Sequence, residues 1–181
     1  SQPIDPYKSN YITSKYLAEL LVNSFSDIIP IINLRLSNIY GPSNFNRPDL
    51  ILTIFNKILN NEKVMINSKK PLRDFIHIDD VSRVTQKILK YGINGEIYHV
   101  SGTAIISICD LVKIICKKMN YNFNKLVTFS ADRPGKDKYY ILSSKKVRKK
   151  FNWGEKVSMN QGLDRCIKWV KSNLNSFSQF D

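Results

Sequence analysis

The sequence predicts an α/β fold with a largely parallel sheet. Short apolar, β-branched runs alternate along the chain with amphipathic stretches of about ten to fifteen residues, the pattern expected of strands joined by crossover helices. The chain has 181 residues, 43% of them hydrophobic, so it is long enough to bury one core. No internal repeat or linker divides it, and we therefore expect a single domain over residues 1–181.

The elements follow from periodicity, caps and breakers. Residues 11–25 carry apolar side chains at helical spacing, and residues 28–36 form an apolar run suited to a strand covered on both faces. Gly41–Pro48 is a loop, and Asp49 is placed to cap the next helix. The remaining expected elements, in order, are a helix over 50–61, strands over 64–66 and 74–78, a helix capped by Asp79 and closed near Gly92, a strand over 97–100, a helix from Ser107 to Met119, a strand over 126–129, and helices over 144–151 and 159–169.

The net charge of +13 is not concentrated in a way that predicts a nucleic-acid surface. The densest basic cluster, residues 145–150, has helical spacing with Val147 and Phe151 facing inward, as on a solvated helix face. The aromatic residues lie mostly on apolar helical stripes rather than among the basic ones. We therefore expect no nucleic-acid partner.

The three cysteines, Cys109, Cys116 and Cys166, include no C-x-x-C pair, so neither a disulfide framework nor a zinc site is expected. They are predicted to be small core residues, and no metal site is predicted. No apolar run reaches the length of a membrane span, and Ser1–Asn10 is too polar for a signal peptide. We expect a cytoplasmic protein with no membrane partner.

The first motif that carries chemistry is Tyr11-Ile-Thr-Ser-Lys15. On a helix, positions i and i+4 share a face at about 5–6 Å, so the lysine ammonium can lie beside the tyrosine hydroxyl. A phenol with a pKa near 10 is a poor base at neutral pH. A neighbouring cation favours the phenolate, and a shift to about 7 takes roughly 4 kcal/mol of differential stabilisation.

The spacing alone proves little. Among nine tyrosines and 21 lysines about one such pair is expected by chance, and a second one, Tyr121 and Lys125, does occur. That second pair encloses Asn-Phe-Asn, which has the composition of a loop, and we assign it to chance. The order of motifs around Tyr11 separates the first pair from the second.

Three ordered blocks resemble the extended short-chain dehydrogenase/reductase family. They are Asp5-Pro6-x4-Tyr11-x2-Ser14-Lys15-x2-Ala18-Glu19, then 34–42 (Leu-Arg-Leu-Ser-Asn-Ile-Tyr-Gly-Pro), then 73–81 (Arg-Asp-Phe-Ile-His-Ile-Asp-Asp-Val). The family includes nicotinamide-dependent nucleotide-sugar epimerases, 4,6-dehydratases and reductases. The resemblance runs from about Pro3 to Lys171 and begins in the middle of the family's pattern.

A fourth block, 132–140 (Asp-Arg-Pro-Gly-Lys-Asp-Lys-Tyr-Tyr), is followed by Ser144-Lys145 and Phe151-Asn152-Trp153. It is similar to the corresponding stretch of dTDP-glucose 4,6-dehydratases, where a histidine is usual at the position of Lys136. The segment Phe45–Ile51 recurs across several related nucleotide-sugar enzymes. The resemblance is therefore closest to the dTDP-glucose 4,6-dehydratase-like members, with an epimerase or reductase acting on UDP- or GDP-sugars as the alternative.

The resemblance implies a role for each matching residue. Tyr11 would be the catalytic acid/base at a sugar hydroxyl, and Lys15 would hold the nicotinamide ribose and favour the phenolate. Asn38, Arg73 and Arg133 would meet the nucleotide-diphosphate sugar, and arginine forks suit a diphosphate because they bind two oxygens at once. The simpler interpretations are a salt bridge to Asp74 or Asp79 for Arg73, a solvated loop charge for Arg133, and loop-backbone hydrogen bonding for Asn38.

The two histidines are not expected to be catalysts: His77 is interpreted as a half-buried structural residue, and His99 as flanking a strand end near the ligand. The sequence contains no G-x-G-x-x-G or G-x-x-G-x-x-G motif, so the phosphate-cradling turn of a dinucleotide fold is not found in this chain.

We therefore expect a partial Rossmann-type sheet with a carboxyl-terminal substrate lobe, the amino-terminal glycine-rich half being absent. NAD or NADP would be bound in the intact enzyme but not by this chain alone, which is expected to be inactive. A homodimer is the expected assembly. The alternative outside the enzymes is a non-catalytic fragment that binds nucleotide-sugar or RNA.

Overall fold

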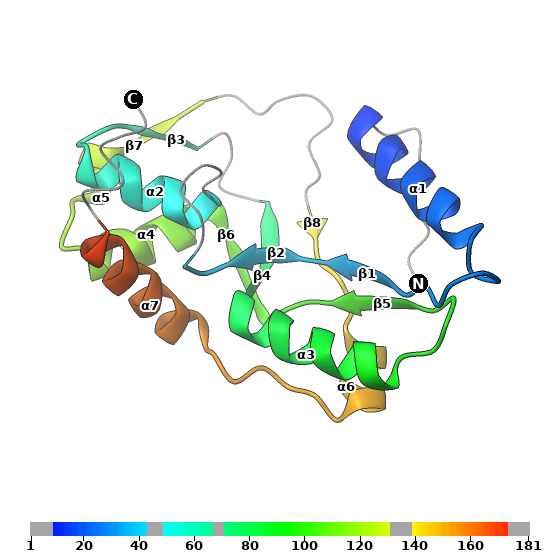
Figure 1. Ribbon diagram of the computed structural model, residues 1–181. Helices are drawn as coiled ribbons and strands as arrows, with labels where there is room; N and C mark the ends of the chain where they lie inside the picture. Colours follow the sequence, from blue (N-terminus) through cyan, green and yellow to red (C-terminus); the bar gives the residue numbers. More distant parts are fainter. Residues whose placement is uncertain (1–8, 43–48, 67–70, 131–138, 174–181) are drawn as a thin grey trace.

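The computed structural model describes residues 9–42, 49–66, 71–130 and 139–173 and has a mixed α/β architecture (Figure 1). The helices are α1 (Asn10–Asn23), α2 (Leu50–Leu59), α3 (Ile78–Tyr91), α4 (Ile108–Lys118), α5 (Phe123–Leu126), α6 (Lys145–Phe151) and α7 (Met159–Ser172). The strands are β1 (Asn33–Leu36), β2 (Asn38–Tyr40), β3 (Val64–Ile66), β4 (Leu72–His77), β5 (Ile97–Val100), β6 (Ala104–Ser107), β7 (Val127–Phe129) and β8 (Tyr139–Tyr140).

The strand pairing confirms the predicted parallel character of the sheet. Strand β1 pairs in parallel with β5, β2 with β4, β3 with β7, and β8 with β4. One described pair is antiparallel, β4 with β6. Only Ser37 separates β1 from β2. The chain therefore passes directly from the β1–β5 pair into the sheet around β4.

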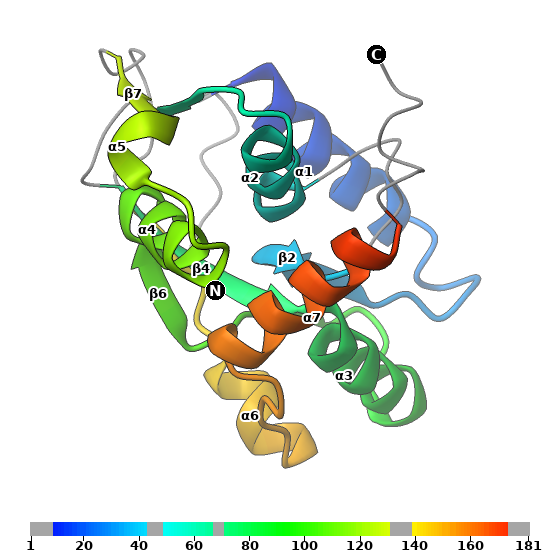
Figure 2. The same ribbon diagram turned by 90° about the vertical axis from the view of Figure 1, so that its left-hand side faces the viewer.

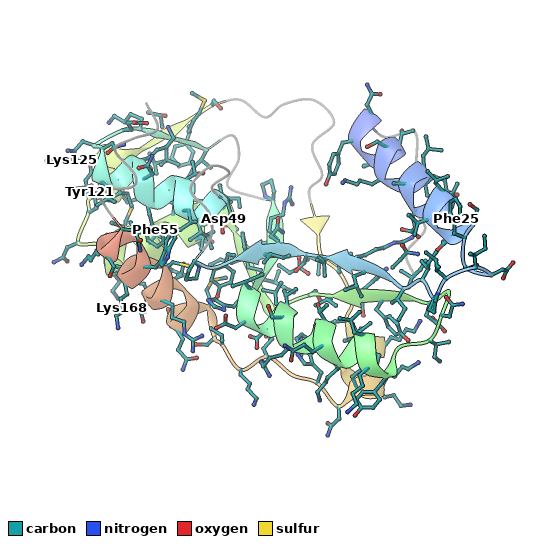
Figure 3. The ribbon with its side chains drawn as sticks, in the orientation of Figure 1. Phe25, Asp49, Phe55, Tyr121, Lys125 and Lys168 are labelled. Carbon is teal, nitrogen blue, oxygen red and sulfur yellow. The ribbon has the colours of Figure 1, made fainter. Side chains whose placement is uncertain are left out.

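Two hydrophobic clusters hold these elements together. The first gathers α2, α4 and α7 around β4, and Phe55 of α2 is fully buried within it (Figures 2 and 3). The second packs α3 and α6 against β5, with Tyr98 and Phe151 meeting edge to face at 5.2 Å between ring centroids. All three cysteines are buried thiols, as predicted, and Val147 and Phe151 face inward from the basic α6.

Several local expectations were wrong in detail. The strand expected over 28–36 begins only at Asn33, and Pro30, which has no N–H to donate to a ladder, lies in the part that is not strand. The cap of α3 is His77 rather than Asp79: the His77 Nδ1 accepts from the Asp79 amide at 3.2 Å, and Asp79 lies in the first helical turn. The short strand β6 and the one-turn helix α5 were not expected.

Helix α1 differs from the other long helices because none of its residues is buried. Its apolar side chains Leu17, Leu20, Leu21 and Val22 are between 44% and 64% exposed. Figure 1 shows α1 standing apart from the helices of the first cluster, above β1. The amphipathic pattern therefore predicted the helix correctly, but the described part of the chain supplies nothing to cover its apolar side.

Candidate functional site

Helix α1 brings Tyr11 and Lys15 together. The Ser9 hydroxyl caps the helix by accepting from the Ile12 amide at 3.2 Å, and this fixes the first turn at Asn10. One turn later the Lys15 ammonium lies 5.6 Å from the centroid of the Tyr11 ring. Tyr11 is 70% exposed, and Lys15 is exposed as well. The i, i+4 spacing thus yields the predicted neighbours on an open surface.

Polar contacts attach α1 to β1. Arg35 forms a two-pronged bond with Glu19, with its Nη2 2.7 Å from Oε1 and its Nε 3.1 Å from Oε2. Both side chains are shielded, with 20% and 15% exposure. One turn further along α1, the Asn33 amide group donates to Asn23 Oδ1 at 2.6 Å. These contacts orient the helix that carries Tyr11, and the sequence motifs gave no sign of the Glu19–Arg35 pair.

Asn38 lies at the start of β2 and faces β4. Its side-chain amide donates to the carbonyl oxygen of Asp74 at 2.9 Å, so part of its role is to join the two strands. It also lines a cavity of about 220 Å³ together with Tyr40, Phe75 and the start of α2. This cavity makes Asn38 accessible to a small ligand.

Asp49 is the N-cap residue of α2 and also lines this cavity. Its carboxylate accepts from the Leu52 amide at 2.8 Å, and burial raises the pKa of that carboxyl despite this hydrogen bond. Figure 3 shows Asp49 at the start of α2, on the side facing the sheet. The sequence identified Asp49 only as a helix cap, because its position next to Asn38 depends on long-range packing.

Arg73 is the second residue of the central strand β4 and lies between two partner strands. It is registered opposite Ile106 of β6 on one edge and Tyr140 of β8 on the other. Its Nη1 donates to the Leu72 carbonyl at 2.8 Å. Asn38 is registered two residues beyond it, opposite Phe75, so β2 and β4 bring two of the predicted substrate residues into adjacent strands.

The neighbouring Asp74 is fully buried and ties β4 to the chain beyond β8. Its Oδ2 accepts from the Leu142 amide at 3.0 Å, and burial raises the pKa of this carboxyl. Asp79, one of the two carboxylates considered as partners of Arg73, pairs with Arg165 of α7 at 2.6 Å. Arg133 lies outside the described residues.

The two histidines have structural surroundings. His77 is 2% exposed, more deeply buried than expected, and burial lowers the pKa of its imidazole. His99 lies in β5, 3.4 Å from the Arg35 guanidinium, and burial followed by that cation lowers its pKa. In the described part of the chain no three histidine, cysteine, aspartate or glutamate side chains gather as a metal site would require.

The same part of the chain contains no helix that is long and apolar enough to span a membrane.

Tyr121 and Lys125, the second pair with the same spacing, lie at the far end of the molecule from α1 (Figure 3). Tyr121 donates its hydroxyl hydrogen to Asn61 at 3.2 Å, and Lys125 lies in the one-turn helix α5. This pair does not share a long helix face, as the pair on α1 does.

Comparison with known proteins places the chain among nucleotide-sugar enzymes. Residues 1–166 match the family model described as GDP-mannose 4,6 dehydratase. The dTDP-glucose 4,6-dehydratase of Shigella flexneri is 25% identical over 181 residues, which cover 96% of this chain and 49% of that protein. The dTDP-glucose 4,6-dehydratase 1 of Escherichia coli K12 is 26% identical over 179 residues, covering 94% of this chain and 48% of that protein. The chain thus spans about half the length of the curated relatives it matches.

Solved structures agree. DesIV, a dTDP-glucose 4,6-dehydratase from Streptomyces venezuelae solved with NAD bound, superposes with a TM-score of 0.90 at 25% identity, covering 100% of this chain and 56% of that one. The UDP-glucuronic acid 4-epimerase of Bacillus cereus, solved with UDP-glucuronic acid and NAD, superposes with a TM-score of 0.80 at 27% identity, covering 91% of this chain and 53% of that one. The Rossmann-type architecture expected from the sequence is confirmed by these neighbours.

Proposed function

Because the chain belongs to the GDP-mannose 4,6 dehydratase family, we propose that it supplies the proton-transfer pair and the substrate contacts of an NAD-dependent nucleotide-sugar 4,6-dehydratase. The observation that carries the proposal is the pair on α1, with the Lys15 ammonium 5.6 Å from the Tyr11 ring on an open helix face. The similarity to dTDP-glucose 4,6-dehydratases over at least 94% of the chain favours a dTDP-sugar as substrate.

The proposed reaction begins with oxidation of a sugar hydroxyl to a ketone. The Tyr11 phenolate takes the hydroxyl proton, and the positive charge of Lys15 stabilises that phenolate before the transfer. NAD, when bound, accepts the hydride from the same carbon. In this proposal Tyr11 would contact the reacting sugar hydroxyl and be the catalytic residue. Lys15 would orient the ribose of the cofactor and stabilise the Tyr11 phenolate.

The nucleotide-diphosphate sugar would be held by Asn38, Arg73 and Arg133. Asn38 lines the cavity described above, and Arg73 lies on the adjacent strand β4, where it has a strand partner on each edge. A guanidinium binds two phosphate oxygens at once, where an ammonium offers a single point of charge.

The residues present fit only the nicotinamide end of the cofactor. Tyr11 and Lys15 offer a hydroxyl and an ammonium to a ribose, but the sequence has no glycine-rich turn for a diphosphate. The apolar side of α1 and the edge of β1 away from β5 would be covered by the remainder of a cofactor fold, which the relatives carry in their additional length. A second copy of the chain is the other proposed partner, as a homodimer.

Nucleotide-sugar binding by this chain tests the proposal directly. A ligand at 100 times its Kd stabilises a protein by about 2.7 kcal/mol, which for a chain of this size raises the Tm by several degrees. We expect dTDP-glucose to raise the Tm more than UDP-glucose or GDP-mannose, and Arg73→Gln to remove the effect. Arg165→Gln, which loses an exposed arginine of α7, is the matched control. No shift with any of the three sugars, or an equal shift in Arg73→Gln, would contradict the proposal.

A 4-epimerase is the second candidate, favoured by the similarity to the UDP-glucuronic acid 4-epimerase, whose identity of 27% is no lower than that of the dehydratases. An epimerase needs only return of the hydride to the other face of the ketone. A larger Tm increase with UDP-glucuronic acid than with dTDP-glucose would favour this candidate over the dehydratase.

A further inference from the structure

A basic groove of about 400 Å³ lies between α3 and the turn that follows α6. Its described lining includes Arg83, Lys87, Lys90 and Tyr91 from α3, facing Trp153 and Lys156 of the turn. Figures 1 and 2 show α3 and α6 on the other side of β1 and β5 from α1, so the groove is separate from the Tyr11 helix. None of its lining residues belongs to the proposed nucleotide-sugar site.

Two of the four cations, Arg83 and Lys87, form bonds that join the two walls of the groove. Arg83 forms an ion pair with Asp80, which is fully buried, and its guanidinium also donates to the Gly154 carbonyl at 3.4 Å. The Lys87 ammonium donates to the carbonyl oxygens of Phe151 at 2.9 Å and Asn152 at 3.3 Å. These bonds join α3 to the turn, so the walls of the groove are preorganised.

The other two cations remain available to a ligand. Neither Lys90 nor Lys156 has a carboxylate within ion-pair distance in the described part of the chain, and Lys90 makes its contact with the Tyr91 ring, 5.2 Å from the centroid. No aspartate or glutamate is among the described lining residues. Asp80, behind the wall, pairs with Arg83, and Glu155, between the lining residues Gly154 and Lys156, bonds to Thr103 and pairs with Arg148. The groove is therefore strongly positive and suits a ligand that carries two or three negative charges.

The walls also offer apolar surface. Tyr91 is 60% exposed at one end of the groove and supplies this surface, whereas Trp153, which also lines the groove, is only 5% exposed and belongs to the second hydrophobic cluster. The Arg148 guanidinium covers one face of that indole, 4.9 Å from its centroid. Inorganic phosphate would leave the aromatic surface uncovered, and a purely apolar ligand would leave the ammonium groups without partners. The groove therefore favours a ligand that combines a planar ring with phosphate groups.

We propose that this groove binds a nucleoside phosphate, with the phosphate oxygens between Lys90 and Lys156 and the base against the exposed ring of Tyr91. This site is distinct from the one proposed for the nucleotide-sugar, and it does not depend on that function. Trp153 provides the readout because it lines the groove, whereas Trp169, on α7, does not. In a Trp169→Phe protein the indole fluorescence therefore reports on the groove alone.

The experiment titrates the 181-residue Trp169→Phe protein with ADP and records Trp153 emission on excitation at 295 nm. We expect a saturable change, with an affinity at least tenfold tighter than for adenosine or pyrophosphate. The double variant Lys90→Gln/Lys156→Gln should weaken ADP binding at least tenfold. Lys117→Gln/Lys168→Gln, which removes two exposed lysines from α4 and α7, should change it less than twofold (Figure 3 shows Lys168).

Each other outcome would overturn the proposal. Absence of a saturable change with ADP would mean that the groove takes no nucleotide, and equal weakening in both double variants would mean a general attraction to the basic chain. Binding of poly-glutamate or pyrophosphate as tight as that of ADP would remove the role of the ring. An Arg73→Gln background separates the two sites: we expect the Trp153 signal to persist there, and its loss would place ADP in the nucleotide-sugar site instead.

Discussion

Replacing Glu19 with glutamine should release helix α1 from the body of the molecule without unfolding the rest. The helix is 14 residues long and buries none of them, so its packing contributes little, and an isolated helix of this length is marginal in water. The pair of bonds from Arg35 to Glu19, 2.7 and 3.1 Å long and mostly shielded from solvent, is its main attachment in the described chain. Losing one partner leaves the arginine partly unpaired, at a cost of about 1–3 kcal/mol.

Hydrogen exchange measures this cost locally. A change of 1–3 kcal/mol in a local opening equilibrium accelerates exchange between about fivefold and 150-fold. We expect that acceleration for the amides of α1 in Glu19→Gln, and unchanged protection in α4, whose residues Leu111, Val112 and Ile115 are fully buried. Glu62→Gln, which breaks an exposed pair with Lys57, is the control and should leave both helices unchanged. Unchanged α1 protection, or an equal loss in α4, would refute the view that α1 is attached locally by this bond.

Three further predictions concern packing, titration and the cofactor. Gly162→Ala should lower the free energy of unfolding by about 1–3 kcal/mol, measured by urea unfolding. Alanine is the better helix former, but a Cβ at this position would lie 2.2 Å from the hydroxyl of the buried Tyr40. An unchanged or higher urea midpoint would contradict this prediction. His77→Asn should remove an acid-side loss of stability: burial lowers the pKa of folded His77, so its contribution is complete above the unfolded pKa near 6.5 and is lost as the pH falls below it. The wild type should therefore lose more stability than the variant between pH 7 and pH 5, and parallel curves would show that His77 does not titrate with unfolding. Calorimetry should detect no micromolar NAD binding to the 181-residue chain, since the sequence lacks a glycine-rich turn; a micromolar Kd would refute this.

Local patterns predicted the helices well because the information they need lies within a few residues. Asp49, Ser107 and Ser158 each precede an apolar periodic run, and each caps the helix that follows. The cap of α3 was predicted wrongly for the same local reason, since Asp79 is a stronger capping residue type than His77. The structure uses both residues: His77 accepts the hydrogen bond, and the Asp79 carboxylate lies in the first turn, where the helix dipole favours a negative charge.

Contacts that depend on strand pairing were outside the reach of the sequence. The neighbours Tyr11 and Lys15 follow from helix geometry, but the approach of Asn38 to the strand of Arg73 depends on the register of Asn38 opposite Phe75, 37 positions away. The strand β6 was missed because it has only four residues, Ala104–Ser107, and the last of them is also the cap of α4. The exposure of the apolar side chains of α1 was not predicted either, because an apolar stripe does not identify what covers it.

The two halves of the proposed chemistry therefore differ in how firmly this chain holds them. Asn38 and Arg73 lie on paired strands above a packed core, so the residues proposed to contact the substrate are positioned by the same burial that stabilises the fold. Tyr11 lies on a helix held by polar contacts alone among the described residues, with its apolar side chains still facing solvent. Proton transfer needs the phenol within hydrogen-bond reach of one sugar hydroxyl, a tolerance that such an attachment does not guarantee. Whatever covers the apolar side of α1 would thus complete the catalytic geometry as well as the hydrophobic core.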